Sequence, residues 1–181
     1  MKFSIEYVKG DDREALRAFW TTCITEAFKV EGIEDEAFIK EEIAEKMSLL
    51  DHSLSGKDGR YHFLIGKMAS EIVGSIGYVP AGEAILKLTG ETCLEMGEIG
   101  TVFVRPNFKG RGVGTKLMNA MLLFLMGKGI QSFCLDSGYG SAQKVWTHKF
   151  GAPVVTAKNF WGEGLDHMVW IQKIEDLKIV I

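Results

Sequence analysis

The segment spanning residues 98–118 is the feature that most constrains the fold of this chain. It reads EIGTVFVRPNFKGRGVGTKLM and passes from a strand-like run, through a turn rich in glycine, into a helix-like run. The alternation over Glu98–Val104 predicts a strand, and Pro106 ends it because proline cannot donate to a strand ladder. The apolar spacing from Gly112 to about Gly127 predicts a helix. A strand, a tight turn and a helix start are therefore expected in immediate succession.

This turn predicts an anion-binding site. Glycines at positions 110, 112 and 114 let the backbone turn sharply without a Cβ in the way. The first amides of a helix have no acceptor within the helix, and the helix dipole adds partial positive charge at the same end. Lys109 and Arg111 add full charges, so a phosphate or pyrophosphate is the expected ligand.

Two common phosphate-binding patterns do not describe the turn. The pattern GxxxxGK[ST] does not occur in the sequence. The dinucleotide pattern GxGxxG would need its third glycine at the position of Thr115, one residue after Gly114. That pattern also belongs to the start of a doubly wound sheet, whereas this turn lies more than halfway along the chain. A Rossmann domain is therefore not favoured.

The remaining periodicities predict a mixed α/β protein. Strands are expected over residues 3–8, 61–68, 71–79, 98–104, 132–136 and 166–173, and helices over residues 13–30, 35–50, 112–127 and 141–149. Residues 80–97 are expected to form a connecting segment with some strand content. The last strand is apolar on both faces, which predicts a central place in the sheet.

Composition bounds the function. A length of 181 residues predicts one domain over residues 1–181, and a hydrophobic fraction of 46% excludes a disordered chain. A net charge of −3 argues against sequence-independent nucleic-acid binding. The three cysteines and four histidines lack ligand spacing, so no metal is expected, and an odd cysteine count indicates free thiols in the cytoplasm. Neither a signal peptide nor a membrane-spanning segment is predicted, and no membrane partner is expected.

The segment resembles the acetyl-coenzyme A motif of the GNAT superfamily of N-acetyltransferases. In that family a strand ends in Val-x-Pro, and the loop Arg/Gln-x-x-Gly-x-Gly/Ala leads into a helix. Val104-Arg105-Pro106 matches the strand end, and Lys109–Gly114 matches the loop with lysine at its first position. The element order over residues 3–174 also agrees. The resemblance implies an N-acetyltransferase fold, with a twisted mixed sheet of six or seven strands flanked by about four helices.

The resemblance also implies transfer of an acetyl group from acetyl-CoA directly to the amine of a small molecule or a peptide. Backbone amides of the loop would hold the pyrophosphate; the residues concerned are Lys109, Gly110, Arg111, Gly112, Val113, Gly114 and Thr115. The backbone of Phe103 and Val104 would pair with the pantetheine arm, as an added strand does. An amide near Val104 would polarise the thioester carbonyl.

Glu98 is the candidate base. Acetylation needs a neutral amine, so a group must accept a proton directly or through water. In some histone acetyltransferases of the superfamily, a glutamate near the start of the equivalent strand does this. The alternative is an ordinary carboxylate at a strand edge, with Glu91 and Glu95 as rival acids or as a negative surface that attracts a cation.

The family's usual acid for the CoA thiolate is missing. A tyrosine is expected on the helix after the fifth strand, but Thr147 stands there with Trp146 beside it. Tyr139 and His148 are the alternative donors, unless water protonates the thiolate. This departure leaves a second function open, an acyl-CoA-binding or regulatory module with little catalysis. A nucleotide-binding domain unrelated to CoA is a third.

The acceptor site is not determined by any short pattern. The aromatic run Asn159–Gly164 is expected to be either a substrate lid or a loop that caps the core. The apolar tail Leu177–Ile181 is expected to form a last strand or part of a homodimer contact.

Overall fold

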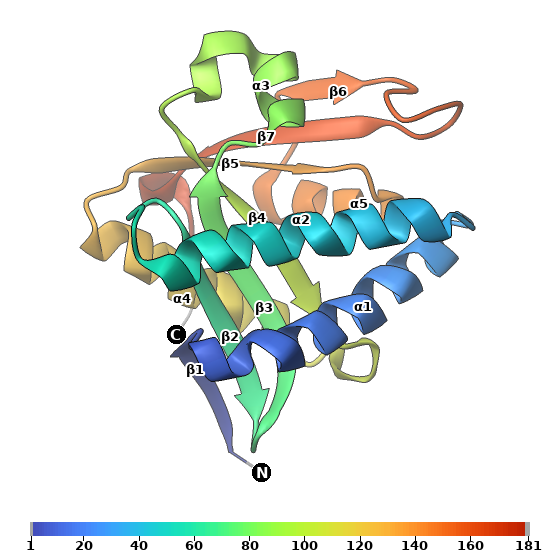
Figure 1. Cartoon of the computed structure of the whole chain (residues 1–181). Coiled ribbons are helices and arrows are strands. Elements are labelled where there is room, and N and C mark those ends of the chain that lie inside the picture. Colours follow the sequence, from blue (N-terminus) through green and yellow to red (C-terminus); the bar gives the residue numbers. More distant parts are fainter. Residues whose placement is uncertain (1, 180–181) are drawn as a thin grey trace.

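The computed structural model describes residues 2–179 and contains a seven-stranded sheet in the order β1-β2-β3-β4-β5-β7-β6 (Figure 1). The strands are β1 (Phe3–Tyr7), β2 (His62–Met68), β3 (Glu71–Pro80), β4 (Gly97–Val104), β5 (Ser132–Ser137), β6 (Val155–Ala157) and β7 (His167–Lys173). The α-helices are α1 (Arg13–Val30), α2 (Glu36–Ser55), α3 (Glu83–Thr89), α4 (Val113–Gly127) and α5 (Gly140–Phe150).

The sheet contains both kinds of strand pairing. Antiparallel pairs join β1 to β2, β2 to β3, β3 to β4, β5 to β7 and β6 to β7. β4 and β5 are parallel, and α4 makes the crossover between them. The mixed α/β fold is therefore confirmed. The central place expected for the last strand is also confirmed, because β7 lies between β5 and β6.

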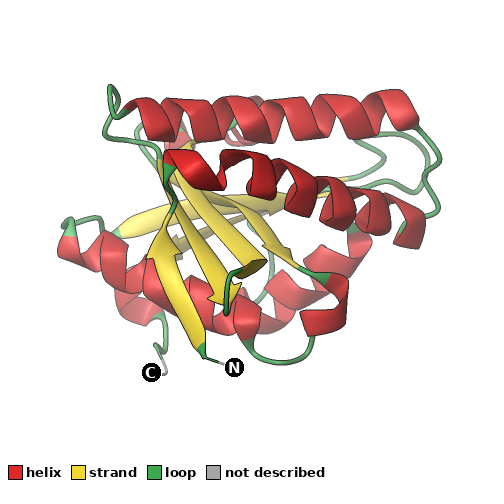
Figure 2. Ribbon diagram, turned by 60° about the horizontal axis from the view of Figure 1, so that its bottom comes forward, coloured by secondary structure: helices red, strands yellow, loops and turns green. Residues whose placement is uncertain are grey.

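Helices cover both faces of the sheet (Figure 2). Side chains of successive strand residues point to opposite faces, so Leu64 belongs to one core and Ile65 to the other. The first core lies against α4, which contributes the fully buried Leu117. The second core lies against α1 and α2, and Trp20 is its largest fully buried side chain. Two layers of helices thus enclose one sheet.

A bulge in β4 ties the α1 layer to the sheet. Between Ser75 and Gly77 of β3 the pairing register shifts, and Thr101 of β4 takes φ +53° there. The Ser75 hydroxyl donates to the Thr101 carbonyl at 2.9 Å, and the Trp20 indole N–H donates to the Ser75 oxygen at 2.9 Å. These buried bonds hold the bulge in place at the centre of the sheet.

The sheet opens between β4 and β5. Among residues 2–179, these strands share a single register pair, Glu98 with Cys134. Beyond it β4 continues toward Val104, while β5, β7 and β6 run in a different direction (Figure 1). The second half of β4 therefore presents toward β5 an edge that no described strand pairs with.

The structure corrects one expectation about the elements. Residues 80–97 were expected to contain some strand, but between β3 and β4 they form α3 and a 3₁₀ turn, Gly90–Cys93. The glycines that suggested a loop are helix caps: Gly82 precedes α3, and Gly90 ends it with φ +60°. With α3 included, residues 2–179 contain five α-helices and a seven-stranded sheet, in agreement with the expected six or seven strands and about four helices. The short β6 is the strand that the sequence did not predict.

The tail does not continue the sheet over its described part. Ile174–Asp176 is a 3₁₀ turn, and Leu177 and Ile179 pack against the first core. Residues 180 and 181 of the predicted tail strand lie outside the described residues. No helix within residues 2–179 is long and apolar enough to cross a membrane.

Candidate active site

The predicted anion loop has the conformation that its glycines allow. A 3₁₀ turn, Pro106–Phe108, follows β4, and α4 begins at Val113 after a left-handed Gly112 with φ +77°. Gly110 is also left-handed, with φ +74°. Lys109 and Arg111 are exposed beside these residues, so their charges face the solvent at the positive end of α4. The loop can therefore hold an anion through backbone amides and two cations.

The other predicted cofactor residues lie on the open edge of β4. Phe103 and Val104 pair on one side with Ser75 and Gly74 of β3. Their other side faces the gap where β4 and β5 have separated. The structure thus brings the strand edge and the anion loop into one continuous segment, which leads from the sheet to the start of α4. An extended ligand arm with an anionic end fits this segment.

Glu98 lies where the sheet opens, on the face covered by α1 and α2. One carboxylate oxygen accepts a hydrogen bond of 2.8 Å from the Gly82 amide. Burial and the neighbouring Asp136 carboxylate raise the pKa of Glu98 to about 8, although the Gly82 amide opposes the shift. A carboxyl group with this pKa can accept or release a proton near neutral pH.

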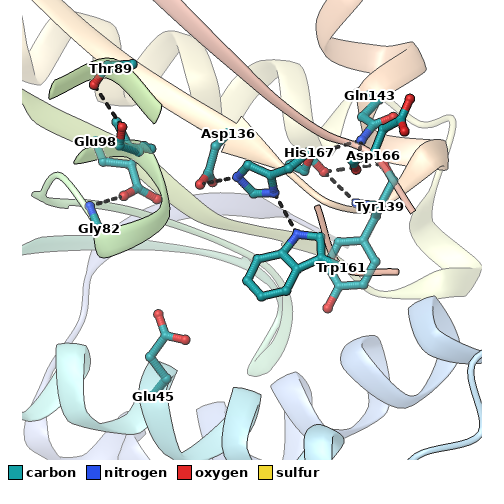
Figure 3. A network of polar contacts seen from close by, with 12 residues as sticks. Glu45, Gly82, Thr89, Glu98, Asp136, Tyr139, Gln143, Trp161, Asp166 and His167 are labelled. Carbon is teal, nitrogen blue, oxygen red and sulfur yellow. Dashed lines mark hydrogen bonds and ion pairs between the residues drawn. The ribbon is translucent and has the colours of Figure 1, made fainter. Parts of the chain in front are cut away.

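Helix α2 adds charged groups to the site. Lys46 lies 3.3 Å from a carboxylate oxygen of Glu42 and 3.3 Å from one of Glu45. Burial alone would lower the pKa of Lys46, but Glu42, Glu45 and Glu98 raise it, so the amine stays charged. Figure 3 shows Glu45 pointing from α2 toward the sheet. Carboxylates surround this region and favour a cationic acceptor.

A chain of three side chains continues from Asp136 across the end of the sheet (Figure 3). The Asp136 carboxylate lies 2.9 Å from Nε2 of His167, and the Trp161 indole N–H donates to Nδ1 of His167 at 2.9 Å. His167 is 4% exposed. No pattern along the sequence singles out Asp136 or His167, because their contact depends on the pairing of β5 with β7.

Tyr139, the other candidate catalytic residue, stands at the start of α5. Its ring packs edge-on against Phe28 of α1, with ring centroids 5.8 Å apart. Burial, the carboxylates of Glu42 and Glu45 on α2, and that of Glu31 just after α1 raise its pKa, so the hydroxyl keeps its proton. Glu45 raises the pKa of both Tyr139 and Glu98, so one acidic side chain affects both candidates.

The other candidate acids and proton donors are exposed to the solvent. Glu91 and Glu95 are exposed, and so are Thr147 and His148 on α5. Trp146 packs against the first core. Cys134 is buried beside Glu98 and donates to the Gly97 carbonyl at 3.5 Å, and burial raises the pKa of its thiol. Within residues 2–179, no three His, Cys, Asp or Glu side chains are grouped as a metal site.

The comparisons with known proteins agree with this geometry. A mixed sheet that opens after Glu98, followed by a glycine turn at the start of α4, defines the N-acetyltransferase fold that the sequence predicted. The chain belongs to the acetyltransferase (GNAT) family, whose model matches residues 27–152. Among curated proteins, no sequence matches the chain.

Solved structures share the fold at low sequence identity. A GNAT-family protein from Desulfovibrio desulfuricans has a TM-score of 0.71 at 16% identity, covering 96% of this chain and 99% of that one. The PaiA N-acetyltransferase of Thermoplasma acidophilum, in complex with coenzyme A, has a TM-score of 0.68 at 17% identity, covering 96% of this chain and 99% of that one. A ribosomal-protein-alanine N-acetyltransferase from Brucella melitensis has a TM-score of 0.66 at 18% identity, covering 94% of this chain and 99% of that one. At these identities the likeness establishes the fold alone.

Proposed function

We propose that the protein transfers an acetyl group from acetyl-CoA directly to the amine of a small molecule or a peptide. The observation that carries this proposal is Glu98, a half-buried carboxyl with a pKa of about 8, at the point where β4 and β5 separate. The glycine turn with Lys109 and Arg111 is an argument for binding of acetyl-CoA, and the carboxylates of α2 are an argument for a cationic acceptor. The structure of PaiA in complex with coenzyme A adds support from the same fold.

In this reaction the protein orients two substrates and moves protons. Acetyl-CoA supplies an activated acetyl group. The amides from Lys109 to Thr115 would hold its pyrophosphate, and the β4 edge at Phe103 and Val104 would align its arm.

The acceptor enters as an ammonium ion, attracted by the surrounding carboxylates, and Glu98 takes one proton from it. The neutral amine, held against the thioester, attacks the carbonyl carbon, and much of the rate comes from this orientation. The C–S bond then breaks, the nitrogen gives up its second proton, and the CoA thiolate gains one from Tyr139 or from water.

The first experiment separates binding from chemistry. Calorimetric titration compares acetyl-CoA with CoA, ATP and NAD, and thiol release is then followed with a panel of amines. Micromolar acetyl-CoA binding with weak ATP and NAD binding, followed by thiol release, supports the proposal. Tight NAD binding without acetyl-CoA binding would overturn the cofactor and the enzyme assignment together.

Glu98→Gln tests the base. We expect kcat/KM for the amine to fall by about 10²–10⁴-fold at pH 7, because the amide cannot accept the ammonium proton. Affinity for acetyl-CoA should stay within about twofold, since the loop is untouched. The wild-type kcat/KM should rise with pH and level off above about 8. The exposed Glu175→Gln is the matched control, and equal activity of both variants would remove Glu98 from the mechanism.

Tyr139→Phe tests the donor to the thiolate. We expect kcat to fall by about tenfold, less than general acid catalysis usually contributes, because burial makes this hydroxyl a weak acid. The KM for acetyl-CoA should not change. An unchanged kcat in Tyr139→Phe would mean that water, and not Tyr139, donates the proton to the CoA thiolate.

A second function, an acyl-CoA-binding or regulatory module with little catalysis, is favoured by one observation. Thr147 is exposed at the position where the family places its tyrosine, and a threonine hydroxyl has no acidic proton to offer. Such a module would bind CoA and acetyl-CoA equally and release no thiol with any amine of the panel.

A further inference from the structure

Two hydrogen bonds fix the position of one proton in the site. An indole N–H can only donate, so Nδ1 of His167 must be the acceptor of the bond from Trp161. The remaining ring proton of the neutral imidazole therefore sits on Nε2 and points at the Asp136 carboxylate, 2.9 Å away. The geometry assigns a single tautomer to a buried histidine.

The sheet places the Asp136 end of this hydrogen-bonded group beside Glu98. Cys134 of β5 is the register partner of Glu98, and Asp136 follows two residues later, so its side chain lies on the same face. Asp136 pairs with Val169 of β7, and His167 lies two residues before Val169 on that face. Asp136 and His167 thus lie on the face that carries the candidate base, at the opening of the sheet.

We propose that Asp136, His167 and Trp161 are positioning residues that act on the acceptor amine through Glu98: Asp136 stands as a fixed negative charge beside Glu98, and the imidazole and the indole hold it there. This inference rests on the proposed function. It assigns a role to the aromatic loop before β7 and to the buried histidine, both of which lie outside the predicted cofactor residues 103–115.

Several groups face Glu98 besides Asp136. Lys46 and Glu45 face it from α2, with opposite effects on its proton. Cys134 lies beside it on β5, and the Gly82 amide faces it from the start of α3. Burial raises the pKa of Glu98 most, and Asp136 has the largest effect among the charges, so the position of Asp136 changes how strongly the carboxyl holds a proton.

The loop that carries Trp161 is held at both ends. Asp166 accepts from Lys158 Nζ at 2.7 Å and from the Asn159 amide at 2.9 Å. Trp161 itself lies against the bare backbone of Gly138, where an added Cβ would be 2.9 Å from the indole nitrogen. Gly138→Ala should therefore displace the indole, while Asp136, His167 and Trp161 themselves remain unsubstituted. The loop is thus linked to Asp136 through the Trp161 indole and the His167 imidazole.

The test compares Asp136→Asn, Trp161→Phe and Gly138→Ala with the exposed control Asp176→Asn. Carbon NMR follows the titration of the Glu98 carboxyl, and nitrogen NMR reports the His167 tautomer. For Asp136→Asn we expect the Glu98 midpoint to fall by about one pH unit, as removal of a near charge does. Trp161→Phe and Gly138→Ala should convert the single Nε2–H tautomer into a mixture. An unchanged midpoint and an unchanged tautomer would overturn the inference.

Kinetics add a readout that a purely structural role would not move. With the best amine of the panel, the rising limb of kcat/KM in Asp136→Asn should shift to lower pH by the same amount as the Glu98 midpoint. Acetyl-CoA affinity should not change, and the control should match the wild type. If no amine is acetylated, the proposed function fails, while the NMR titration still decides whether the chain controls Glu98. A rate loss without a shifted limb would contradict the positioning role.

Discussion

At the residue scale, one proton on Glu98 links the site to the stability of the protein. The pKa of this carboxyl is about 8, against an ordinary value of 4.5. Between these values the native state keeps a proton that the unfolded chain has released, so the free energy of unfolding falls as pH rises. Glu98→Gln should therefore gain stability relative to the wild type, by at most about 1.4 kcal/mol per pH unit. Urea unfolding at pH 5, 6, 7 and 8 checks this, and a constant difference would contradict it.

At the element scale, the start of α4 separates cofactor binding from folding. A Cβ at Gly112 would meet no atom within 4 Å, so a substitution strains the left-handed backbone, at about 1–2 kcal/mol, without an internal clash. Gly112→Asp adds a negative charge where the pyrophosphate is expected. It should lower affinity for CoA by about 100-fold or more, equivalent to about 2.7 kcal/mol. Gly112→Asn, with the same shape and no charge, is the control. Calorimetry and thermal unfolding measure both, and equal CoA affinity in the aspartate variant and the wild type would remove the loop from the site.

At the scale of the whole molecule, Ser75 joins the α1 layer to the central strands. Its hydroxyl accepts from Trp20 and donates to the Thr101 carbonyl, and all three residues are buried. Ser75→Ala leaves an indole N–H and a carbonyl without partners, which should lower the free energy of unfolding by about 1–3 kcal/mol. The exposed Ser70→Ala in the β2–β3 turn should have no effect. Denaturant unfolding measures both variants, and equal stability would contradict the link.

The parts predicted from sequence are those that lie close together along the chain. The strand, the turn and the helix of residues 97–127 form one continuous run, so local propensity and glycine spacing describe them. The α3 segment was misinterpreted because Gly82 and Gly90, which cap the helix, also occur in loops. β6 has three residues, too few to show a periodicity.

The surroundings of Glu98 could not be predicted in the same way. Asp136, Trp161 and His167 meet only because β5 pairs with β7, and no local pattern encodes that register. The position of Glu98 was predicted, but its high pKa depends on burial and on Asp136, which belong to the folded state. The sequence therefore indicated the candidate base but not the side chains that lie around it in the folded protein.

The exposure of Trp161 gives the protein an intrinsic optical reporter. Trp20 and Trp170 are fully buried, Trp146 is partly buried against the first core, and Trp161 is 48% exposed on the loop beside the site. A dissolved collisional quencher reaches an exposed indole and not a buried one, so Trp161 contributes the largest quenchable part of the emission and Trp146 a smaller one. Quenching of tryptophan fluorescence can therefore follow the order of residues 158–166 in the unlabelled protein while each substrate is added.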